Sequence, residues 1–197
     1  RQIMPYLSGF IAEVGSGTGT FTKMLVADNY LVTTIDVNLN YSPQVNLDLQ
    51  IKNLPHRLLN KFDTIVALNV LEHIPNNFQA MSNLWRMLKD GGKLITLVPA
   101  GSWAYGSLDL HLGHEFRYEI DQVQKLMAQT GFKIIFQRYL NTLGLIGWFV
   151  NGKLLKRKIL PTQQLRIFDV ISLPLLWLET KIRFPWGLSI LTVAHKV

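Results

Sequence analysis

Apolar residues recur along the chain in short runs that alternate with amphipathic stretches. Runs of about 4–8 apolar or β-branched residues between turn signals are typical of buried strands in a parallel sheet. Such runs occur at residues 9–14, 30–35, 44–49, 62–68, 93–99, 132–139 and 187–195. Apolar residues at helical spacing predict helices between them, over residues 20–29, 77–89 and 119–130. We expect residues 100–118, which contain glycine, to form a loop.

Strands that alternate with helices of about 10–15 residues predict a doubly wound α/β sheet with right-handed crossovers. The chain has 197 residues, 48% of them apolar, which suits one domain of ordinary size with its own core. The sequence begins at Arg1 and its first predicted strand follows within ten residues. We therefore expect that an N-terminal segment precedes it, and no signal peptide can be recognised.

The stretch from Glu13 to Phe21 places three glycines between the first predicted strand and the first predicted helix. In an open α/β sheet this turn forms the floor of the ligand crevice, and glycine lets a ligand approach the main chain. The spacing here is G-x-G-x-G, whereas a pyrophosphate-binding loop reads G-x-G-x-x-G and a triphosphate loop ends in G-K-[ST]. The pattern therefore disfavours a dinucleotide or a nucleoside triphosphate.

An acidic residue, Asp36, ends the second predicted strand 21 residues after Gly15 (36 − 15 = 21). A carboxylate at this place accepts hydrogen bonds from ribose hydroxyls and repels a 2′-phosphate. A glycine loop by itself is also consistent with a tight strand-to-helix connection. The strand, loop, helix, strand and acid taken together favour a nucleoside site.

Four blocks in the right order resemble class I S-adenosylmethionine-dependent methyltransferases, in the branch of small-molecule and quinone enzymes, over about residues 9–139. The blocks are 11–19, 34–36, 46–49 and 62–74, the last close to F-D-x-V-x-x-x-x-V-L-E-H-I. The resemblance implies a Rossmann-like sheet of seven strands, mostly parallel, whose last strand lies antiparallel beside the fifth. The turn 89–94 departs from the family's L-x-P-G-G-x-L because Asp90 replaces the proline.

The same resemblance implies S-adenosylmethionine as the cofactor, with the glycine loop at its methionine and sugar, Asp36 at the ribose, and Asp48 at the adenine amino group. Leu49 would pack near the adenine ring, and Leu68 and Asn69 would lie near the sulfur. The implied cofactor contacts are Glu13, Gly15, Gly17, Gly19, Asp36, Asp48, Leu49, Leu68 and Asn69.

The acceptor side is expected in residues 111–118, which follow the fifth strand. His114 and His111 are the candidate catalytic bases, since a histidine that titrates near neutral pH can deprotonate a hydroxyl or amine. Arg117 and Tyr118 are candidate substrate contacts. Some bacterial members encoded with sugar-transfer enzymes carry a similar G-H-x-R-R-Y block, although Phe116 replaces its first arginine here. The alternative, that these residues only fasten the loop to the next helix, stays open.

Glu72 and His73 belong to the fourth block, and we expect a structural role for them, as caps or backbone partners. The chain has no cysteine, which excludes disulfides and thiolate metal ligands, and we predict no metal site.

The net charge of +7 lies mostly in the C-terminal quarter: residues 1–149 hold 12 Lys and Arg against 11 Asp and Glu, and residues 150–197 hold 8 against 2. Two apolar runs, 141–150 and 171–178, flank a basic cluster there, and both are too short to span a membrane. They predict either helices that cover the acceptor side or a surface that contacts anionic lipid. The basic residues of the cluster are Lys153, Lys156, Arg157, Lys158 and Arg166.

Together these patterns predict a cytoplasmic methyltransferase for a small-molecule or lipid- or sugar-linked acceptor, methylated on oxygen or nitrogen, with peripheral membrane contact left open. Residues 1–197 would form a single domain, with a core at about 9–139 and 188–196 and a helical insertion at 140–187. Nucleic acid is not expected, because no stacking aromatics alternate with the basic residues. The alternatives are a catalytically silent cofactor-binding module that recruits a partner at a membrane and, with less support, an NAD-dependent oxidoreductase.

Overall fold

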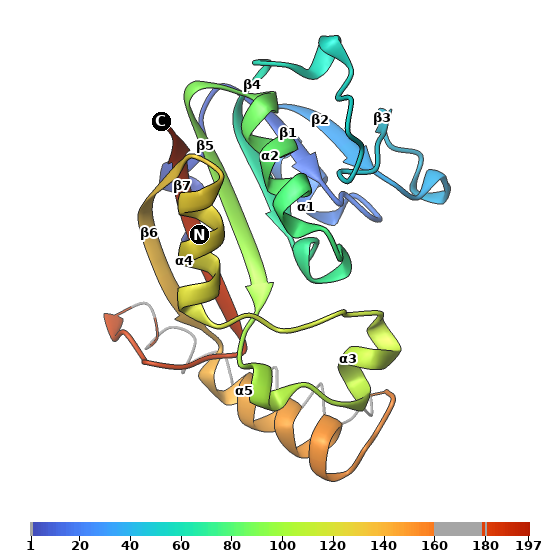
Figure 1. Cartoon of the computed structure of the whole chain (residues 1–197), viewed down its shortest axis with the longest axis vertical. Coiled ribbons are helices and arrows are strands. Elements are labelled where there is room, and N and C mark those ends of the chain that lie inside the picture. Colours follow the sequence, from blue (N-terminus) through green and yellow to red (C-terminus); the bar gives the residue numbers. More distant parts are fainter. Residues whose placement is uncertain (1, 160–178, 180) are drawn as a thin grey trace.

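The computed structural model of the chain describes residues 2–159, 179 and 181–197, and in this part seven strands form one sheet (Figure 1). The strands are β1 (Phe10–Val14), β2 (Leu31–Asp36), β3 (Val45–Asn46), β4 (Phe62–Leu68), β5 (Leu88–Pro99), β6 (Phe132–Leu140) and β7 (Ser189–Lys196). Their order is β3-β2-β1-β4-β5-β7-β6. Strands β1 to β5 pair in parallel, and β7 lies antiparallel between β5 and β6. The predicted fold class, including the antiparallel last strand beside the fifth, is confirmed.

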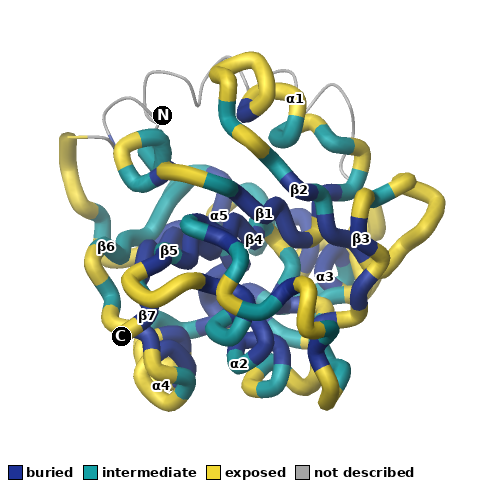
Figure 2. Tube along the Cα trace, turned by 90° about the horizontal axis from the view of Figure 1, so that it is seen from above, coloured by how far each residue is buried: buried dark blue, intermediate teal, exposed yellow. Residues whose placement is uncertain are grey.

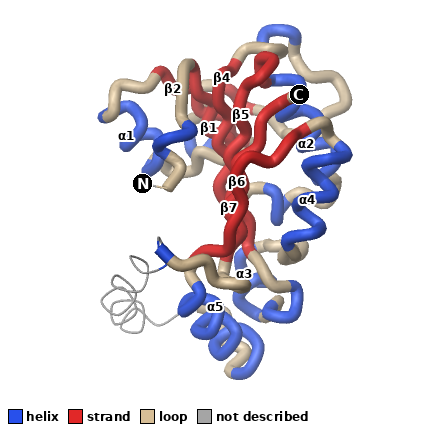
Figure 3. Tube along the Cα trace, turned by 90° about the vertical axis from the view of Figure 1, so that its left-hand side faces the viewer, coloured by secondary structure: helices blue, strands red, loops and turns tan. Residues whose placement is uncertain are grey.

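Helices cover both faces of the sheet and one of its ends. They are α1 (Thr20–Ala27), α2 (Asn77–Met87), α3 (Ser107–Leu112), α4 (Ile120–Gln129) and α5 (Thr142–Phe149), which continues into a π-helical turn, Val150–Leu154. Helix α1 and the N-terminal segment lie on one face, and α2 and α4 lie on the other (Figure 3). Helices α3 and α5 lie beyond the end toward which β5 points (Figure 1). This carboxyl end is where α/β sheets bind ligands.

The core lies on both faces of the central strands, which are the most deeply buried parts of the chain (Figure 2). On the α2 and α4 face, Phe62, Ile65 and Leu94 pack against the helices in one apolar cluster. On the α1 face, Ile11, Val66 and Ile95 form a smaller one. Neighbouring residues of β4 thus face opposite sides of the sheet, and both sides are apolar because both are covered by helices.

The predicted elements are correct in type but differ at their ends, and one helix was missed. The helix expected over 77–89 ends at Met87, because Leu88 is already extended and pairs with Phe62 of β4. The strand predicted over 44–49 is shorter in the structure, where β3 contains only two residues. Helix α3 lies within 100–118, where a loop was expected; its sequence, S-L-D-L-H-L, alternates with a period of two and lacks a helical pattern.

The C-terminal quarter is described only in part. The apolar run 141–150 forms α5, whereas the run 171–178 and Arg166 lie outside the described residues. Among the helices that the structure does describe, none combines the length and the apolar character needed to cross a membrane.

Candidate functional site

The glycine loop between β1 and α1 takes a backbone conformation that L side chains rarely adopt. Gly15, Gly17 and Gly19 have φ values of +70°, +49° and +73°. The Gly15 N–H donates to the carbonyl of Ile35 at 2.8 Å, and a Cβ at Gly15 would lie 2.4 Å from Cγ2 of Val70. A Cβ at Gly17 would meet no atom within 4 Å. The loop therefore presents main chain, rather than side chains, to the space above it.

Asp36, at the end of β2, supports this loop. One carboxylate oxygen accepts the N–H of Gly17 at 2.9 Å, and the other accepts the N–H of Asn38 at 2.9 Å. The residue is only 7% exposed. A carboxylate has about four acceptor positions, so two stay available for hydroxyl donors.

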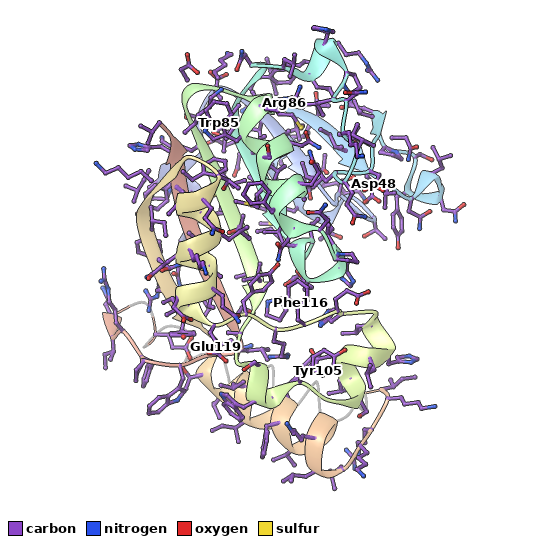
Figure 4. All side chains as sticks on the ribbon, in the orientation of Figure 1. Asp48, Trp85, Arg86, Tyr105, Phe116 and Glu119 are labelled. Atoms are coloured by element: carbon purple, nitrogen blue, oxygen red, sulfur yellow. The ribbon has the colours of Figure 1, made fainter. Side chains whose placement is uncertain are left out.

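A cleft of about 540 Å³ lies above the glycine loop at the carboxyl end of the strands. Six of the nine predicted cofactor contacts line it: Gly15, Gly17, Asp36, Asp48, Leu49 and Asn69. Figure 4 shows Asp48 on the β3 side of the sheet, where its carboxylate accepts the N–H of Gln50 at 2.8 Å. Tyr41 and His73 also line the cleft and were not predicted as contacts.

The other three predicted cofactor residues do not line the cleft. Glu13 is buried beneath the loop, where its carboxylate accepts a hydrogen bond from the Thr22 hydroxyl, and burial raises its pKa. Gly19 forms the N-cap of α1. Leu68 packs against the apolar cluster on the α1 face of the sheet. Glu13 and Gly19 thus support the conformation of the loop without facing the cleft.

A second cavity, of about 400 Å³, adjoins the first, and Asn69 and His73 line both. Its wall contains the predicted residues His114 and Arg117 together with Leu112 and Trp148. Asn69, directly after β4, has φ +53°, and its N–H donates to the carbonyl of Leu97. The two cavities therefore meet at the carboxyl ends of β4 and β5.

Asp109 of α3, which was not among the predicted site residues, organises the wall of the second cavity. Its carboxylate is fully buried and accepts hydrogen bonds from Nδ1 of His114 (3.0 Å), Nε of Arg117 (2.7 Å), Nε1 of Trp148 (2.9 Å) and the N–H of Gly106 (3.0 Å). Burial alone would raise the pKa of Asp109, but the bonds from His114 and Trp148 and the charge of Arg117 lower it to about 2. Asp109 is thus a carboxylate at neutral pH, and His114 carries its proton on Nδ1.

Arg117 and Trp148 close the wall. The guanidinium of Arg117 donates from Nη1 to the carbonyl of Ala100 at 2.6 Å and lies 4.8 Å from the centre of the Trp148 ring. Helix α5, which provides Trp148, is thereby fixed to the loop after β5.

Two residues predicted for the acceptor side lie elsewhere. The Tyr118 hydroxyl donates to the carbonyl of Leu71 at 3.2 Å, and the ring lines a separate cavity beside Phe116. His111 is exposed on α3, beside Lys158. Figure 4 shows Phe116 on the loop between the sheet and α3, and Tyr105 in the layer of α3 and α5, where its hydroxyl donates to the carbonyl of His114.

Glu72 and His73 follow β4 in a 3₁₀ turn at the junction of the cavities. His73 meets the expectation of a backbone partner, since its Nδ1 lies 2.9 Å from the carbonyl of Gly113. Glu72 does not: its side chain is fully buried, and neither carboxylate oxygen has a hydrogen-bond partner in the described part of the chain. Burial raises the pKa of Glu72 to about 7.

Comparisons with known proteins find related sequences and related folds. A family model described as a methyltransferase domain matches residues 9–137. A ubiquinone biosynthesis O-methyltransferase of Coxiella burnetii is 30% identical over 95 residues, which are 43% of this chain and 41% of that protein. The match thus spans less than half the length of this curated relative.

Solved structures share the fold at low identity. A SAM-dependent methyltransferase from Archaeoglobus fulgidus has a TM-score of 0.66 and 15% identity, with 100% of this chain and 90% of that chain covered. Phosphoethanolamine N-methyltransferase 2 of Haemonchus contortus, in complex with S-adenosyl-L-methionine, has a TM-score of 0.59 and 15% identity, with 99% of this chain and 50% of that chain covered.

Proposed function

The chain belongs to the methyltransferase-domain family, and we propose that it transfers a methyl group from S-adenosylmethionine to oxygen or nitrogen of a small-molecule or lipid- or sugar-linked acceptor. The observation that carries this proposal is the junction of the two cavities at Asn69 and His73. A cofactor in the first cavity can present its methyl group to an acceptor in the second. A catalytically silent module does not require this second, histidine-lined cavity, and the G-x-G-x-G spacing of the loop disfavours the pyrophosphate of an NAD-dependent oxidoreductase.

The first cavity suits a nucleoside joined to an amino acid. Asp36 keeps acceptor positions for the ribose hydroxyls, and we assign Asp48 and Leu49, which line the same cavity, to the adenine. Gly17 leaves open space beside the main chain. The loop holds no lysine of the P-loop pattern, so no side chain there is suited to a phosphate chain.

The second cavity suits alignment and deprotonation of the acceptor. Methyl transfer from a sulfonium is an in-line displacement in which the acceptor lone pair forms the new bond as the carbon–sulfur bond breaks. Alignment alone contributes up to about 7–11 kcal/mol in well-oriented systems. Because Nδ1 of His114 donates to Asp109, Nε2 of the same ring can take the proton from the hydroxyl or amine that is methylated.

The segment 140–187 is proposed to form the acceptor side of this single domain, because α5 contributes Trp148 to the cavity wall. The end of α5 also favours a lipid-linked acceptor. Apolar side chains there are largely exposed beside Lys156 and Lys158, a combination that suits an anionic membrane surface. These side chains are Ile146 (59% exposed), Leu154 (62%), Leu155 (54%) and Ile159 (71%).

Calorimetric titration with S-adenosylmethionine and with S-adenosylhomocysteine tests the cofactor, and we expect both to bind. A mass-spectrometric screen then identifies the acceptor among phenols, amines, sugars and lipid-linked compounds, with and without anionic vesicles. Absence of binding by either compound would contradict the proposal and make NAD⁺ the next ligand to test. Binding of both without transfer to any class would favour the catalytically silent module.

Asp36→Ala is expected to lower the affinity for S-adenosylmethionine about 10–100-fold, since a hydrogen bond to a charged group contributes about 1.5–3 kcal/mol. Calorimetry measures the change, and the melting temperature shows whether the fold persists. Asp28→Ala, in an exposed residue at the end of α1, is the matched control. Unchanged affinity in Asp36→Ala would show that Asp36 does not bind the ribose hydroxyls.

Gly15→Ala is expected to weaken cofactor binding about 10–100-fold. The new Cβ collides with Val70 and displaces the loop, which breaks one or two hydrogen bonds between the loop and the cofactor. Gly91→Ala is the control, because Gly91 has a similar φ of +72° but open space around its Cβ position. Partial recovery of affinity in the double variant Gly15→Ala/Val70→Ala would identify the collision as the cause. Equal affinities for wild type and Gly15→Ala would show that the loop does not contact the cofactor.

A further inference from the structure

We propose that Glu72, His73 and His114 bind a divalent transition-metal cation, such as Zn²⁺ or Mn²⁺, where the two cavities meet. One carboxylate oxygen of Glu72 and one ring nitrogen of each histidine all lie within 4.8 Å of one another. We predicted no metal site from the sequence, which contains no cysteine. His73 and His114 are 41 residues apart in the chain (114 − 73 = 41).

The first argument is the buried carboxyl group of Glu72. It is fully buried, and neither of its oxygens has a hydrogen-bond partner in the described part of the chain. A buried carboxylate without a partner is costly, and such groups are usually paired or bound to a metal. A cation between Glu72 and the two histidines satisfies this requirement.

The second argument is the hydrogen bonding of the two imidazoles. Nδ1 of His73 donates to the carbonyl of Gly113 at 2.9 Å, because a carbonyl can only accept, and Nδ1 of His114 donates to Asp109 at 3.0 Å. Each ring therefore keeps Nε2 as a free electron pair. Metal-binding histidines almost always donate their other N–H to a carbonyl or carboxylate, as both do here.

The third argument is the donor set. Two imidazole nitrogens and one carboxylate suit Zn²⁺ or Mn²⁺ better than Mg²⁺, which prefers oxygen ligands. Bonds of about 2.1 Å hold tetrahedral ligands about 3.4 Å apart, so the three ligand groups, which offer atoms within 4.8 Å of one another, must move closer together when the cation binds. Rotation of the side chains supplies such a movement, and His73 is exposed enough for a cation to enter.

Three protein ligands leave the coordination of the cation incomplete, and the open positions face the second cavity, which His73 and His114 line. An acceptor hydroxyl that occupies such a position loses its proton more readily, because the cation stabilises the resulting oxyanion. This narrows the acceptor to a compound with a hydroxyl or phenol oxygen as methyl acceptor. The narrowing rests on the proposed methyl transfer, whereas the binding of the cation does not.

The test is a titration of the full chain with Zn²⁺ by calorimetry and with Mn²⁺ by electron paramagnetic resonance, both without cofactor. We expect one site per chain. His73→Gln and Glu72→Gln are each expected to weaken binding by more than the about 10–100-fold that loss of an outer-shell partner costs. His56→Gln, in an exposed histidine outside the set, is the control and should bind like the wild type.

Glu72→Gln has nearly the same shape and avoids a buried charge, so we expect it to fold, and a melting temperature close to that of the wild type verifies this. Equal metal affinity in wild type, Glu72→Gln and His73→Gln, or no binding by the wild type, would overturn the proposal. Either result leaves the proposed methyl transfer standing, since cofactor binding and the acceptor screen test that function separately.

Discussion

Asp109→Asn is expected to lower the free energy of unfolding by about 3–5 kcal/mol, the typical cost of removing one partner of a buried ion pair. Asp109 is fully buried, and its charge compensates that of Arg117, which is 3% exposed. Asparagine keeps the size of the side chain but loses the charge and offers one acceptor oxygen in place of two. Four donors, from the N-cap residue of α3, the loop after α3 and α5, then compete for that oxygen. Chemical denaturation with urea measures the change.

Asp63→Asn is the matched control, because it removes the same charge from a partly exposed ion pair with Lys89, in which the two side chains are 34% and 47% exposed. Exposed pairs contribute about 0–1 kcal/mol, so this variant should unfold close to the wild type. If both variants lose the same small amount, the carboxylate of Asp109 does not hold the wall of the second cavity together. Because both variants remove one negative charge, the difference between their free energies of unfolding measures the effect of burial.

Much of the fold was predictable because both faces of the sheet are covered. A strand buried on both faces is apolar throughout, and this made β4 recognisable at its observed ends, Phe62 and Leu68. The strand β3 was predicted too long because only Val45 and Asn46 reach the partner strand. Helix α3 was missed because it is short and its N-terminus depends on the side chain of Asp109 accepting the N–H of Gly106. The periodicity of apolar residues cannot predict such a hydrogen bond.

The lining of the first cavity was more predictable than that of the second, for a physical reason. Gly15, Gly17 and Asp36 are determined by a local turn and by the end of an adjacent strand, so their spacing appears in the sequence. The second cavity combines residues that are far apart in the chain: Trp148 bonds to Asp109, which is 39 residues away. In the sequence, Trp148 was one apolar residue in an apolar run, and Asp109 was one acid in an expected loop. The one local signal was the position of Asp109 three residues after Gly106, from which an acidic side chain can accept the N–H of a helix N-cap residue.

His114→Ala is expected to reduce turnover about 10²–10⁴-fold with the acceptor that the screen identifies, because proton transfer by a positioned side chain contributes on this scale. His114 lines the second cavity and not the first, so the affinity for S-adenosylmethionine should stay near that of the wild type. Calorimetry and initial-rate kinetics separate the two effects. His56→Ala is the control for loss of a histidine elsewhere, and His111→Ala shows whether the other predicted histidine contributes.

Two roles of His114 predict different behaviour of the same variant. If Nε2 of His114 removes the acceptor proton directly, free imidazole should restore part of the turnover of His114→Ala, and chelators should leave the wild type active. If Nε2 instead holds a cation with Glu72 and His73, chelators should inactivate the wild type, and imidazole should restore activity only when the metal is supplied. Unchanged turnover in His114→Ala would contradict both roles. The catalytic contribution of this side of the cavity would then be alignment alone, provided by the wall that Asp109, Arg117 and Trp148 hold in place.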